Sequence, residues 1–308
     1  MKFGGQKIGR IIVPKLFHKP VLLKEAIEFL NVKAGEKYID ATVGGGGHSE
    51  AILKAQGEIL GIDCDPEAIK SAREYLSSAC PNTSWQLARG NFKDLKEIAT
   101  ANGFVPVAGI LFDLGVSSCQ LETPKRGFSF NLEGPLDMRM DPDLKVTAAD
   151  LVNVLGENEL AEIFFKFGEE RYSRRIARAI CCARQVAPIE TANKLAEIIL
   201  RARPRRGRFD RTHPATRCFQ ALRIAVNDEL NNLKRALPQA LEILKPGGQL
   251  VVLSFHSLED RIVKNFLKSA AGEGKLQILT KKPIRPTYEE IEANPRSRSA
   301  KLRAGEKK

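Results

Sequence analysis

The feature that most restricts the fold of this chain is a run of four glycines, Gly44–Gly47, between an apolar segment and a helical pattern. The full stretch reads YIDATVGGGGHSEAIL over residues 38–53. Consecutive glycines let the backbone adopt positive φ and approach a ligand, and the free N–H groups of the following helix point toward it. A strand, a glycine loop and a helix in this order predict a ligand site, with a purely structural turn as the alternative.

Alternating strand and helix patterns in the first third of the chain predict a parallel sheet with helices on both faces. Buried strands are predicted at residues 37–42, 58–63 and 108–114, with a shorter candidate at 85–87. After the second strand, Pro66 opens a stretch with apolar residues at helical spacing, and proline is well tolerated at a first helical position. The expected fold class is therefore α/β.

The alternation stops near Leu121, and helical patterns dominate from there to residue 218. A helix and a further strand at 249–255 then resume the first pattern. We therefore predict one sheet completed from both sides of an inserted domain. The predicted parts are a flexible N-terminal extension (1–16), a discontinuous ligand-binding domain (17–120 and 219–308) and a mainly helical insertion for substrate recognition (121–218).

Positive charge is concentrated in the predicted insertion. The chain carries 49 Lys and Arg against 37 Asp and Glu, a net charge of +12, and thirteen of the basic residues lie in 171–217. Such an asymmetry favours a polyanionic partner such as RNA, because each phosphate that is neutralised releases condensed counterions. A solvated basic face is the alternative. The candidate phosphate contacts are Arg171, Arg174, Arg175 and Arg178 at helical spacing, and Arg205, Arg206 and Arg208 in a loop.

Cysteine and histidine usage argues against a metal site. The six cysteines form no C-x-x-C pair, and only four histidines are present. No apolar run reaches the roughly 18 residues that cross a bilayer, and the first sixteen residues lack the apolar stretch of a secretory signal. We expect a cytoplasmic protein with reduced thiols, no metal and no membrane partner.

Acidic and aromatic residues at the predicted strand ends refine the ligand site. Asp63 lies nineteen residues beyond Gly44, where a carboxylate suits ribose hydroxyls. Asp65 is predicted to cap the helix that begins at Pro66, a role compatible with the first. Phe92 follows the third strand, either beside an adenine or in the core. The G-x-G-x-x-G spacing of dinucleotide sites is not met, which disfavours a nicotinamide-dependent oxidoreductase.

Nine motifs follow one another along the chain: HKPVLLKEAI (18–27), GGGGHS (44–49), FDLGVSS (112–118), RGFSF (126–130), GPLDMRMD (134–141), GEERYSRRIARAI (168–180), HPATRCFQALRIAVN (213–227), SFHSLEDRIVK (254–264) and NPRSRSAKLR (294–303). With these motifs the chain resembles the bacterial ribosomal RNA small-subunit methyltransferase H family, also called MraW, from about Phe17 to Glu306.

The resemblance implies a Rossmann-like, class I methyltransferase sheet with a helical insertion, and S-adenosylmethionine as cofactor. It implies methylation of the N4 amine of a cytidine in the decoding region of small-subunit (16S) rRNA. The implied cofactor contacts are Gly46, Gly47, His48, Asp63, Phe92, Asp113 and Gln120. Cys119 departs from the family, which usually has proline at this position.

Methyl transfer from a sulfonium is an in-line displacement, so the protein must position the reactants and exclude water, and no metal is required. Acceptors that bind the amino hydrogens of cytosine would localise the nitrogen lone pair. Asp113, Ser117 and Ser118 are the candidates in the DLGVSS loop. His256 is a further candidate at another strand end, with packing or substrate positioning as its alternative, and Ser257 is the predicted N-cap of the helix that follows.

Several alternatives remain open from the sequence. Phe128 and Phe130 are candidates for stacking on the target base, and ordinary core residues otherwise. An amine methyltransferase for DNA or another RNA, and a non-catalytic RNA-binding or ribosome-assembly protein, are the competing functions. The sequence does not distinguish a monomer from a homodimer.

Overall fold

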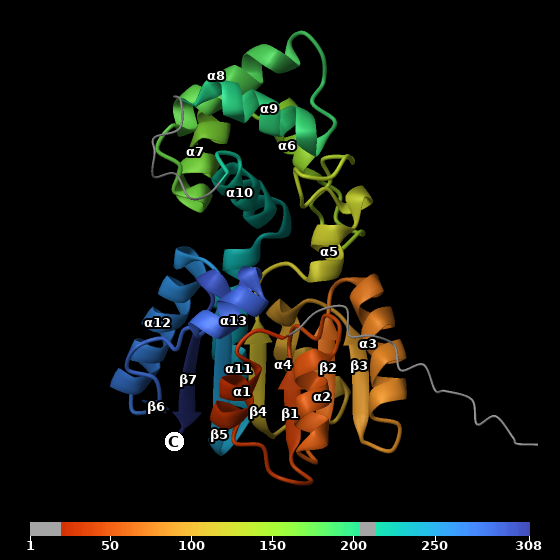
Figure 1. Cartoon of the computed structure of the whole chain (residues 1–308). Helices are drawn as coiled ribbons and strands as arrows, with labels where there is room; N and C mark the ends of the chain where they lie inside the picture. Colours follow the sequence, from red (N-terminus) through yellow and green to blue (C-terminus); the bar gives the residue numbers. More distant parts are fainter. Residues whose placement is uncertain (1–19, 204–212) are drawn as a thin grey trace, which may run out of the picture.

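A seven-stranded sheet forms the lower half of the molecule (Figure 1). The computed structural model describes residues 20–203 and 213–308. The strands are β1 (Lys37–Asp40), β2 (Glu58–Asp63), β3 (Trp85–Arg89), β4 (Val107–Asp113), β5 (Leu244–Ser254), β6 (Leu276–Ile278) and β7 (Lys301–Lys307). Their order across the sheet is β3-β2-β1-β4-β5-β7-β6.

The first five strands run parallel, and β7 pairs antiparallel with β5 and β6. The chain winds outward from β1 in one direction to β2 and β3, and in the other to β4 and β5, so the strand order reverses between β1 and β4. Ligands of open α/β sheets bind at such a switch point, beyond the carboxyl ends of the strands. The predicted Rossmann-like α/β fold is confirmed, including the short third strand.

The sequence did not predict β6 and β7, because a strand such as KLRAGEK has only two apolar residues, Leu302 and Ala304, too few for a clear alternation. In the structure Leu302 and Ala304 are buried, and Arg303 is buried because Asp260 accepts a hydrogen bond from its Nε at 2.6 Å. An ion pair between β7 and α12 therefore replaces an apolar side chain at this position.

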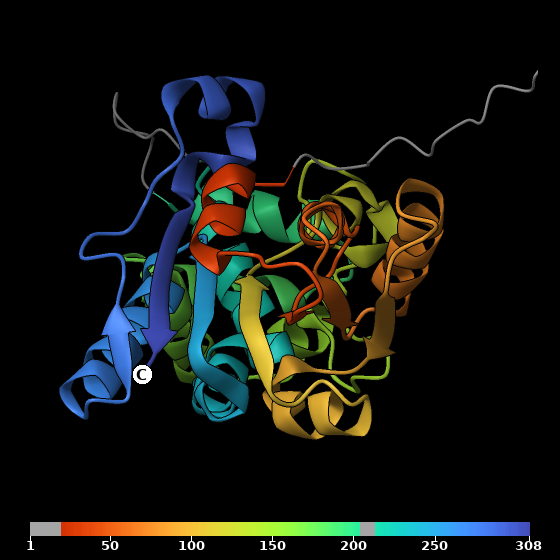
Figure 2. The ribbon, with the colours of Figure 1, turned by 90° about the horizontal axis from the view of Figure 1, so that it is seen from below.

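Helices cover both faces of the sheet, as the view from below shows (Figure 2). The helices are α1 (Leu23–Leu30), α2 (Gly47–Lys54), α3 (Pro66–Ala79), α4 (Leu95–Ala101), α11 (Glu229–Ile243), α12 (Ser257–Gly272) and α13 (Tyr288–Ala293). Buried side chains of α1, α2 and α3 meet one face, where Tyr38 and Leu111 lie. Side chains of α4, α11 and α12 meet the other face. Among the described residues, no helix is both long and apolar enough to span a bilayer.

A second layer of helices lies above the carboxyl edge of the sheet (Figure 1). It contains α5 (Ser118–Glu122), α6 (Ala148–Val154), α7 (Glu157–Gly168), α8 (Ser173–Arg184), α9 (Ala192–Ala202) and α10 (Thr216–Asn227). These helices share a hydrophobic cluster that includes Phe164, Ile180 and Ile199, and α10 contributes Phe219 and Leu222 to it. The predicted domain boundary at residue 218 lies within α10, and the division into domains stays a prediction.

The two phenylalanines of RGFSF belong to this helical layer. Phe128 is buried in its cluster, and the ring of Phe130 stacks on His213 with 4.5 Å between centroids. Phe130 also meets Phe219 edge to face at 5.0 Å. Their role as core residues is therefore the one that the structure supports.

Candidate active site

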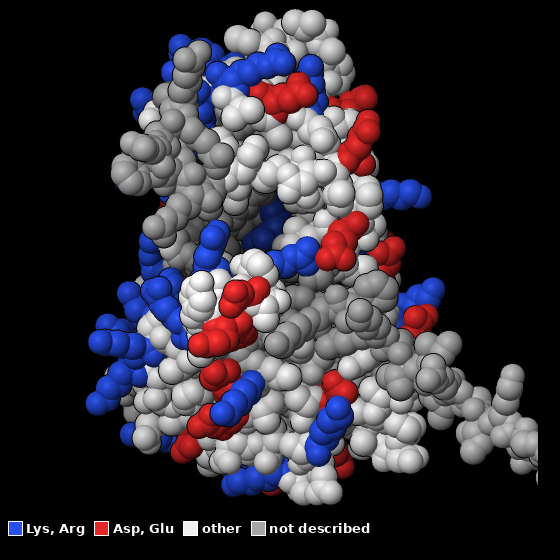
Figure 3. Space-filling model, viewed as in Figure 1, with Lys and Arg blue, Asp and Glu red and all other residues white. Residues whose placement is uncertain are grey.

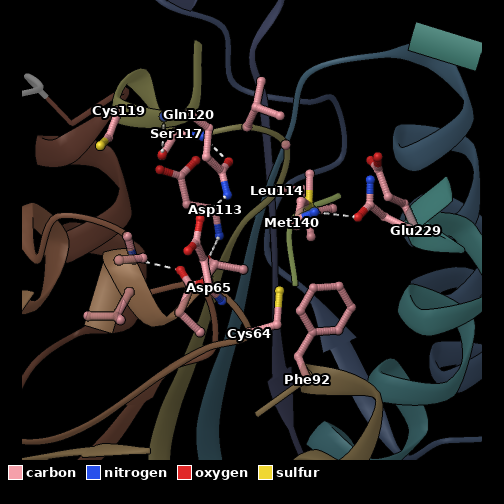
Figure 4. A pocket seen from close by; sticks show the side chains of 18 of the residues that line it. Cys64, Asp65, Phe92, Asp113, Leu114, Ser117, Cys119, Gln120, Met140 and Glu229 are labelled. Carbon is pink, nitrogen blue, oxygen red and sulfur yellow. Dashed lines mark hydrogen bonds between the residues drawn. The ribbon is translucent and has the colours of Figure 1, made fainter. Parts of the chain in front are cut away.

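A cavity of about 850 Å³ opens at the switch point of the sheet and reaches up to α10 and α11 (Figure 4). The predicted site residues that line it are Gly47, His48, Asp63, Phe92, Asp113, Ser117 and Gln120. Figure 4 shows Asp65, Asp113 and Gln120 together on one side and Glu229 opposite them. Most of the predicted site residues are thus brought to one cavity from strands that are distant in sequence.

The glycine loop connects β1 to α2 and uses the conformations that only glycine adopts easily. Gly44 has φ +49° and Gly46 has φ +85°. A Cβ at Gly45 would meet no atom within 4 Å, so this part of the loop borders open space. Gly46 does not line the cavity and packs against α3 instead. A Cβ at this position would lie 3.3 Å from the side chain of Leu76, so a glycine lets the loop lie close to the helix.

Asp63 ends β2 and holds the loop in place. Its Oδ2 accepts a hydrogen bond from Gly44 N at 3.0 Å, and its Oδ1 accepts one from Asp65 N at 2.9 Å. Burial raises the pKa of Asp63 to about 6. Each carboxylate oxygen retains acceptor capacity, since an ionised carboxylate offers about four lone pairs.

Asp65 caps α3 as predicted, accepting a hydrogen bond from Glu67 N at 3.0 Å. Its other oxygen, Oδ2, lies 2.8 Å from Gln120 Nε2 and 2.8 Å from an Arg126 guanidinium nitrogen. Arg126 also donates to the backbone carbonyl of Met140 at 2.9 Å. This Asp65 cluster ties β2 to α5 and to the loop below the helical layer. Sequence reasoning missed Arg126, although it begins the RGFSF motif.

Replacing Arg126 with Met is expected to lower the free energy of unfolding by about 3 kcal/mol, because it leaves the buried carboxylate of Asp65 without its cation. Arg89→Met is the matched control, since Arg89 pairs with two acidic residues at the surface and exposed ion pairs contribute little to stability, so its loss should cost far less. Urea unfolding measures both. Adding Asp65→Asn to Arg126→Met should recover part of the loss, and equal costs for the two arginines would contradict the prediction.

Asp113 ends β4, and one of its carboxylate oxygens accepts no hydrogen bond. Its Oδ1 is buried and has no hydrogen-bond partner, while its Oδ2 lies 3.5 Å from His48 Nδ1. Burial raises the pKa of Asp113 to about 7, and the negative charge of Glu259 adds to the effect. The Val21 carbonyl lies 3.2 Å from His48 Nε2, which assigns the proton of the neutral ring to that nitrogen. Burial lowers the pKa of His48, so the unprotonated Nδ1 faces Asp113.

Ser117 is the N-cap of α5. Its Oγ accepts a hydrogen bond from Gln120 N at 3.2 Å, and Gln120 Oε1 accepts one from Ser117 N at 3.0 Å. This capping box fixes the loop after β4 and leaves the hydroxyl proton of Ser117 as a donor. The side chain of Ser118 lies outside the described part of the structure. Cys119 is exposed at the cavity, in the first turn of the same helix (Figure 4).

His256, and not the predicted Ser257, is the N-cap of α12. Its Nδ1 accepts from Glu259 N at 3.4 Å, and its Nε2 lies 3.1 Å from Glu259 Oε1. The prediction of Ser257 was wrong because an imidazole can cap a helix as a hydroxyl does. His256 does not line the cavity, whereas Phe255 and Glu259 do. The H-x-x-E spacing of a capping box was the signal for Glu259.

Glu259 belongs to a buried ionic network that sequence reasoning missed. Arg223 donates from Nε to Glu229 Oε1 at 2.8 Å and from a terminal nitrogen to Oε2 at 2.9 Å. Glu229, His256 and Glu259 bring three ligand-type atoms within 4.8 Å of one another. Both oxygens of Glu229 already bind Arg223, and Glu259 Oε2 accepts from Phe255 N at 2.8 Å. The positive charge of Arg223 therefore lies directly against the Glu229 carboxylate.

The predicted phosphate contacts lie away from this cavity. Arg171 is exposed just before α8, and Arg174, Arg175 and Arg178 are exposed along it. Arg178 Nε lies 3.3 Å from Glu157 Oε1. Lys and Arg side chains gather over the helical layer in Figure 3. Arg205, Arg206 and Arg208 lie outside the described residues.

Comparison with known proteins matches the MraW methylase family to residues 15–308. The chain is 51% identical to the ribosomal RNA small subunit methyltransferase H of Thermomicrobium roseum, over 94% of this chain and 93% of that protein. It is 49% identical to the protein of the same name from Carboxydothermus hydrogenoformans, over 94% and 97%. A putative rRNA-methylase structure from Clostridium thermocellum gives a TM-score of 0.48 at 15% identity, over 95% of this chain and 100% of that one, a likeness too distant to argue from. The chain therefore belongs to the MraW methylase family, a family of S-adenosylmethionine-dependent methyltransferases.

Proposed function

We propose that this protein transfers a methyl group from S-adenosylmethionine to the N4 amine of a cytidine in the decoding region of small-subunit 16S rRNA. The observation that carries the proposal is the buried, unpartnered Oδ1 of Asp113 in the same cavity as Asp63 and the glycine loop. The names of the relatives support the RNA substrate. The choice of cytidine and of its amine rests on the family resemblance.

The residues of the cavity fit a nucleoside with a positively charged tail. Asp63 keeps lone pairs for two ribose hydroxyls after binding Gly44 N and Asp65 N. Phe92 lines the cavity beside Gly90 and Asn91 and offers a ring for the adenine. Asp113 Oδ1 needs an N–H donor, and both a cofactor ammonium and a cytosine amine are such donors. When bound, S-adenosylmethionine supplies a methyl group activated by its sulfonium.

The chain's own contribution to the reaction is to hold the amine and to exclude water. A buried carboxylate that accepts from the amino hydrogens would leave the nitrogen lone pair free to attack along one line. Asp113 suits this role because it lies at the carboxyl end of β4 and lines the same cavity as Asp63, Phe255 and Met140. The hydroxyl proton of Ser117 is a further donor at the same edge.

The helical layer is proposed to recognise the RNA. Arg171, Arg174 and Arg175 are exposed, and the structure resolves no acidic partner for these three side chains among the described residues. Phosphate contact orients a nucleic acid without reading its sequence, so the arginines would place the strand while the cavity receives the base. A base inside a helix must be flipped out to reach a methyl group held at the sheet edge.

Labelled methyl transfer tests the proposal directly. Small ribosomal subunits that lack the modification are incubated with the protein and methyl-labelled S-adenosylmethionine, and the RNA is digested to nucleosides. We expect the label in N4-methylcytidine, and its incorporation about 10² to 10³ fold slower with Asp113→Asn. Label in another nucleoside, or in naked DNA and not in the subunits, would exclude the proposed substrate. Binding of the cofactor without any transfer would favour a non-catalytic RNA-binding role.

A further inference from the structure

We propose that three basic residues on α12 form a second contact surface for the RNA phosphate backbone, separate from the arginines of the helical layer. This α12 strip consists of Arg261, Lys264 and Lys268. It lies on the half of the protein that carries the sheet, whereas the charge distribution of the sequence predicted RNA contacts only in the helical insertion. The inference rests on the proposed function and names a further part of its substrate interface.

The spacing of the residues places them on one line along the helix. Ser257, Arg261, Lys264 and Lys268 are separated by four, three and four residues, and side chains at such intervals lie one above the other. Arg261 and Lys268 are exposed and Lys264 is half-buried. Val263 is buried on the opposite side, facing the sheet. The strip is therefore the solvent face of α12 over about 10 Å of helix.

Glu169 connects the α12 strip to the helical layer. This residue ends α7, and its Oε2 accepts a hydrogen bond from Ser257 Oγ at 2.8 Å. Its Oε1 accepts from Arg261 at 3.1 Å, and its backbone carbonyl accepts from Arg217 at 2.9 Å. The hydrogen bond from Ser257 lowers the pKa of Glu169, so the carboxylate is charged at neutral pH. Arg171 follows two residues later, so the basic surface continues from one layer to the other.

Arg261 pairs with Glu169, whereas the charges of the two lysines of the α12 strip are not balanced by an ion pair. Within the described residues, neither Lys264 nor Lys268 takes part in a salt bridge. Asp260 lies one turn before Lys264, and its carboxylate is already paired with Lys301 and Arg303. Figure 3 shows Lys and Arg side chains gathered over α12 as well as over the helical layer above it.

A phosphate backbone is the partner that suits this surface best. The strip is linear, positively charged and continuous through Arg217 and Arg171 with the arginines that we propose to bind RNA. Each phosphate that a lysine neutralises releases counterions, which gives binding a dependence on salt that a structural role does not produce.

The test compares Lys264→Gln/Lys268→Gln with a matched control, Lys33→Gln/Lys70→Gln, which removes two exposed lysines that form no ion pair within the described part of the chain. Arg261 is left unchanged because it pairs with Glu169. Binding to a 16S rRNA fragment containing the decoding region is measured between about 50 and 200 mM salt. Methyl transfer to small subunits, S-adenosylmethionine affinity and thermal unfolding are measured on the same samples.

We expect the α12 variant to bind RNA about tenfold more weakly, with the slope of log affinity against log salt reduced by about 1.4 to 1.8. The control variant should match the unchanged protein, and cofactor affinity and unfolding temperature should be the same in all three.

An unchanged slope for the α12 variant overturns the inference. A defect on assembled subunits without any on free RNA also overturns it and assigns the strip to a ribosomal protein. Failure of the unchanged protein to methylate subunits would refute the proposed function. The salt dependence of RNA binding tests the α12 strip independently of that result.

Discussion

Asp113→Asn is expected to reduce methyl transfer by about 10² to 10³ fold, because the amide removes the buried negative charge that accepts the substrate amine. The substitution keeps the shape of the side chain, so the cavity should remain. Burial raises the pKa of Asp113 to about 7, and the ionised form is the acceptor. The value of kcat/KM should therefore rise between pH 6 and pH 8 in the unchanged protein and show a weaker dependence in the variant. A full pH dependence in the variant would assign the titration to another group.

The same substitution should stabilise the ligand-free protein. A carboxyl whose pKa is raised in the folded state favours folding below its ordinary pKa, and that contribution is lost as the pH rises through about 7. The side chain is 21% exposed, which reduces the effect, and we expect a gain on the order of 2 kcal/mol at pH 8. Urea unfolding of both proteins at pH 5 and pH 8 measures it. If the variant were less stable than the unchanged protein at pH 8, the ionised carboxylate of Asp113 would not be destabilising the folded state.

Asp63→Ala is expected to weaken binding of S-adenosylmethionine by about a hundredfold. The carboxylate supports the glycine loop through Gly44 N and is proposed to accept the ribose hydroxyls, and hydrogen bonds to a charged group contribute about 1.5 to 3 kcal/mol each. Calorimetric titration with the cofactor measures the change. Asp143→Ala removes an exposed carboxylate outside the cavity and serves as the control. Equal affinities for the two variants would remove Asp63 from the cofactor site.

The parts of the fold that the sequence predicted share a local signal. β2 was predicted to the residue because EILGID is an apolar run bounded by polar turns, and Asp63 was found because its role depends only on the end of that strand. The C-terminal strand β7 was missed because its register depends on pairing with β5, far away in the sequence. A polar strand gives no periodic signal when an ion pair such as Arg303 with Asp260 supports it.

In the site, too, the residues with a local signal were predicted and those that depend on long-range contacts were not. Asp113 and Gln120 came from the family resemblance, and the structure adds why they are held: the capping box of Ser117 fixes the turn between them. The salt bridge of Arg126 with Asp65 and the network of Arg223 with Glu229 join segments that only the folded chain brings together. Neither residue type nor spacing identifies such pairs, since each arginine resembles the other surface arginines of the sequence.

The Asp65 cluster has a thermodynamic consequence. The Asp65 carboxylate accepts from Glu67 N in the first turn of α3, from Gln120 and from Arg126, and the backbone N–H of Asp65 donates to Asp63. A shift of the helices that we propose to bind RNA should therefore disturb the side of the cavity that we propose to hold the ribose, and the reverse. Binding equilibria linked in this way are reciprocal: whatever factor the methyl donor contributes to the affinity for the ribosome, the ribosome must contribute to the affinity for the methyl donor.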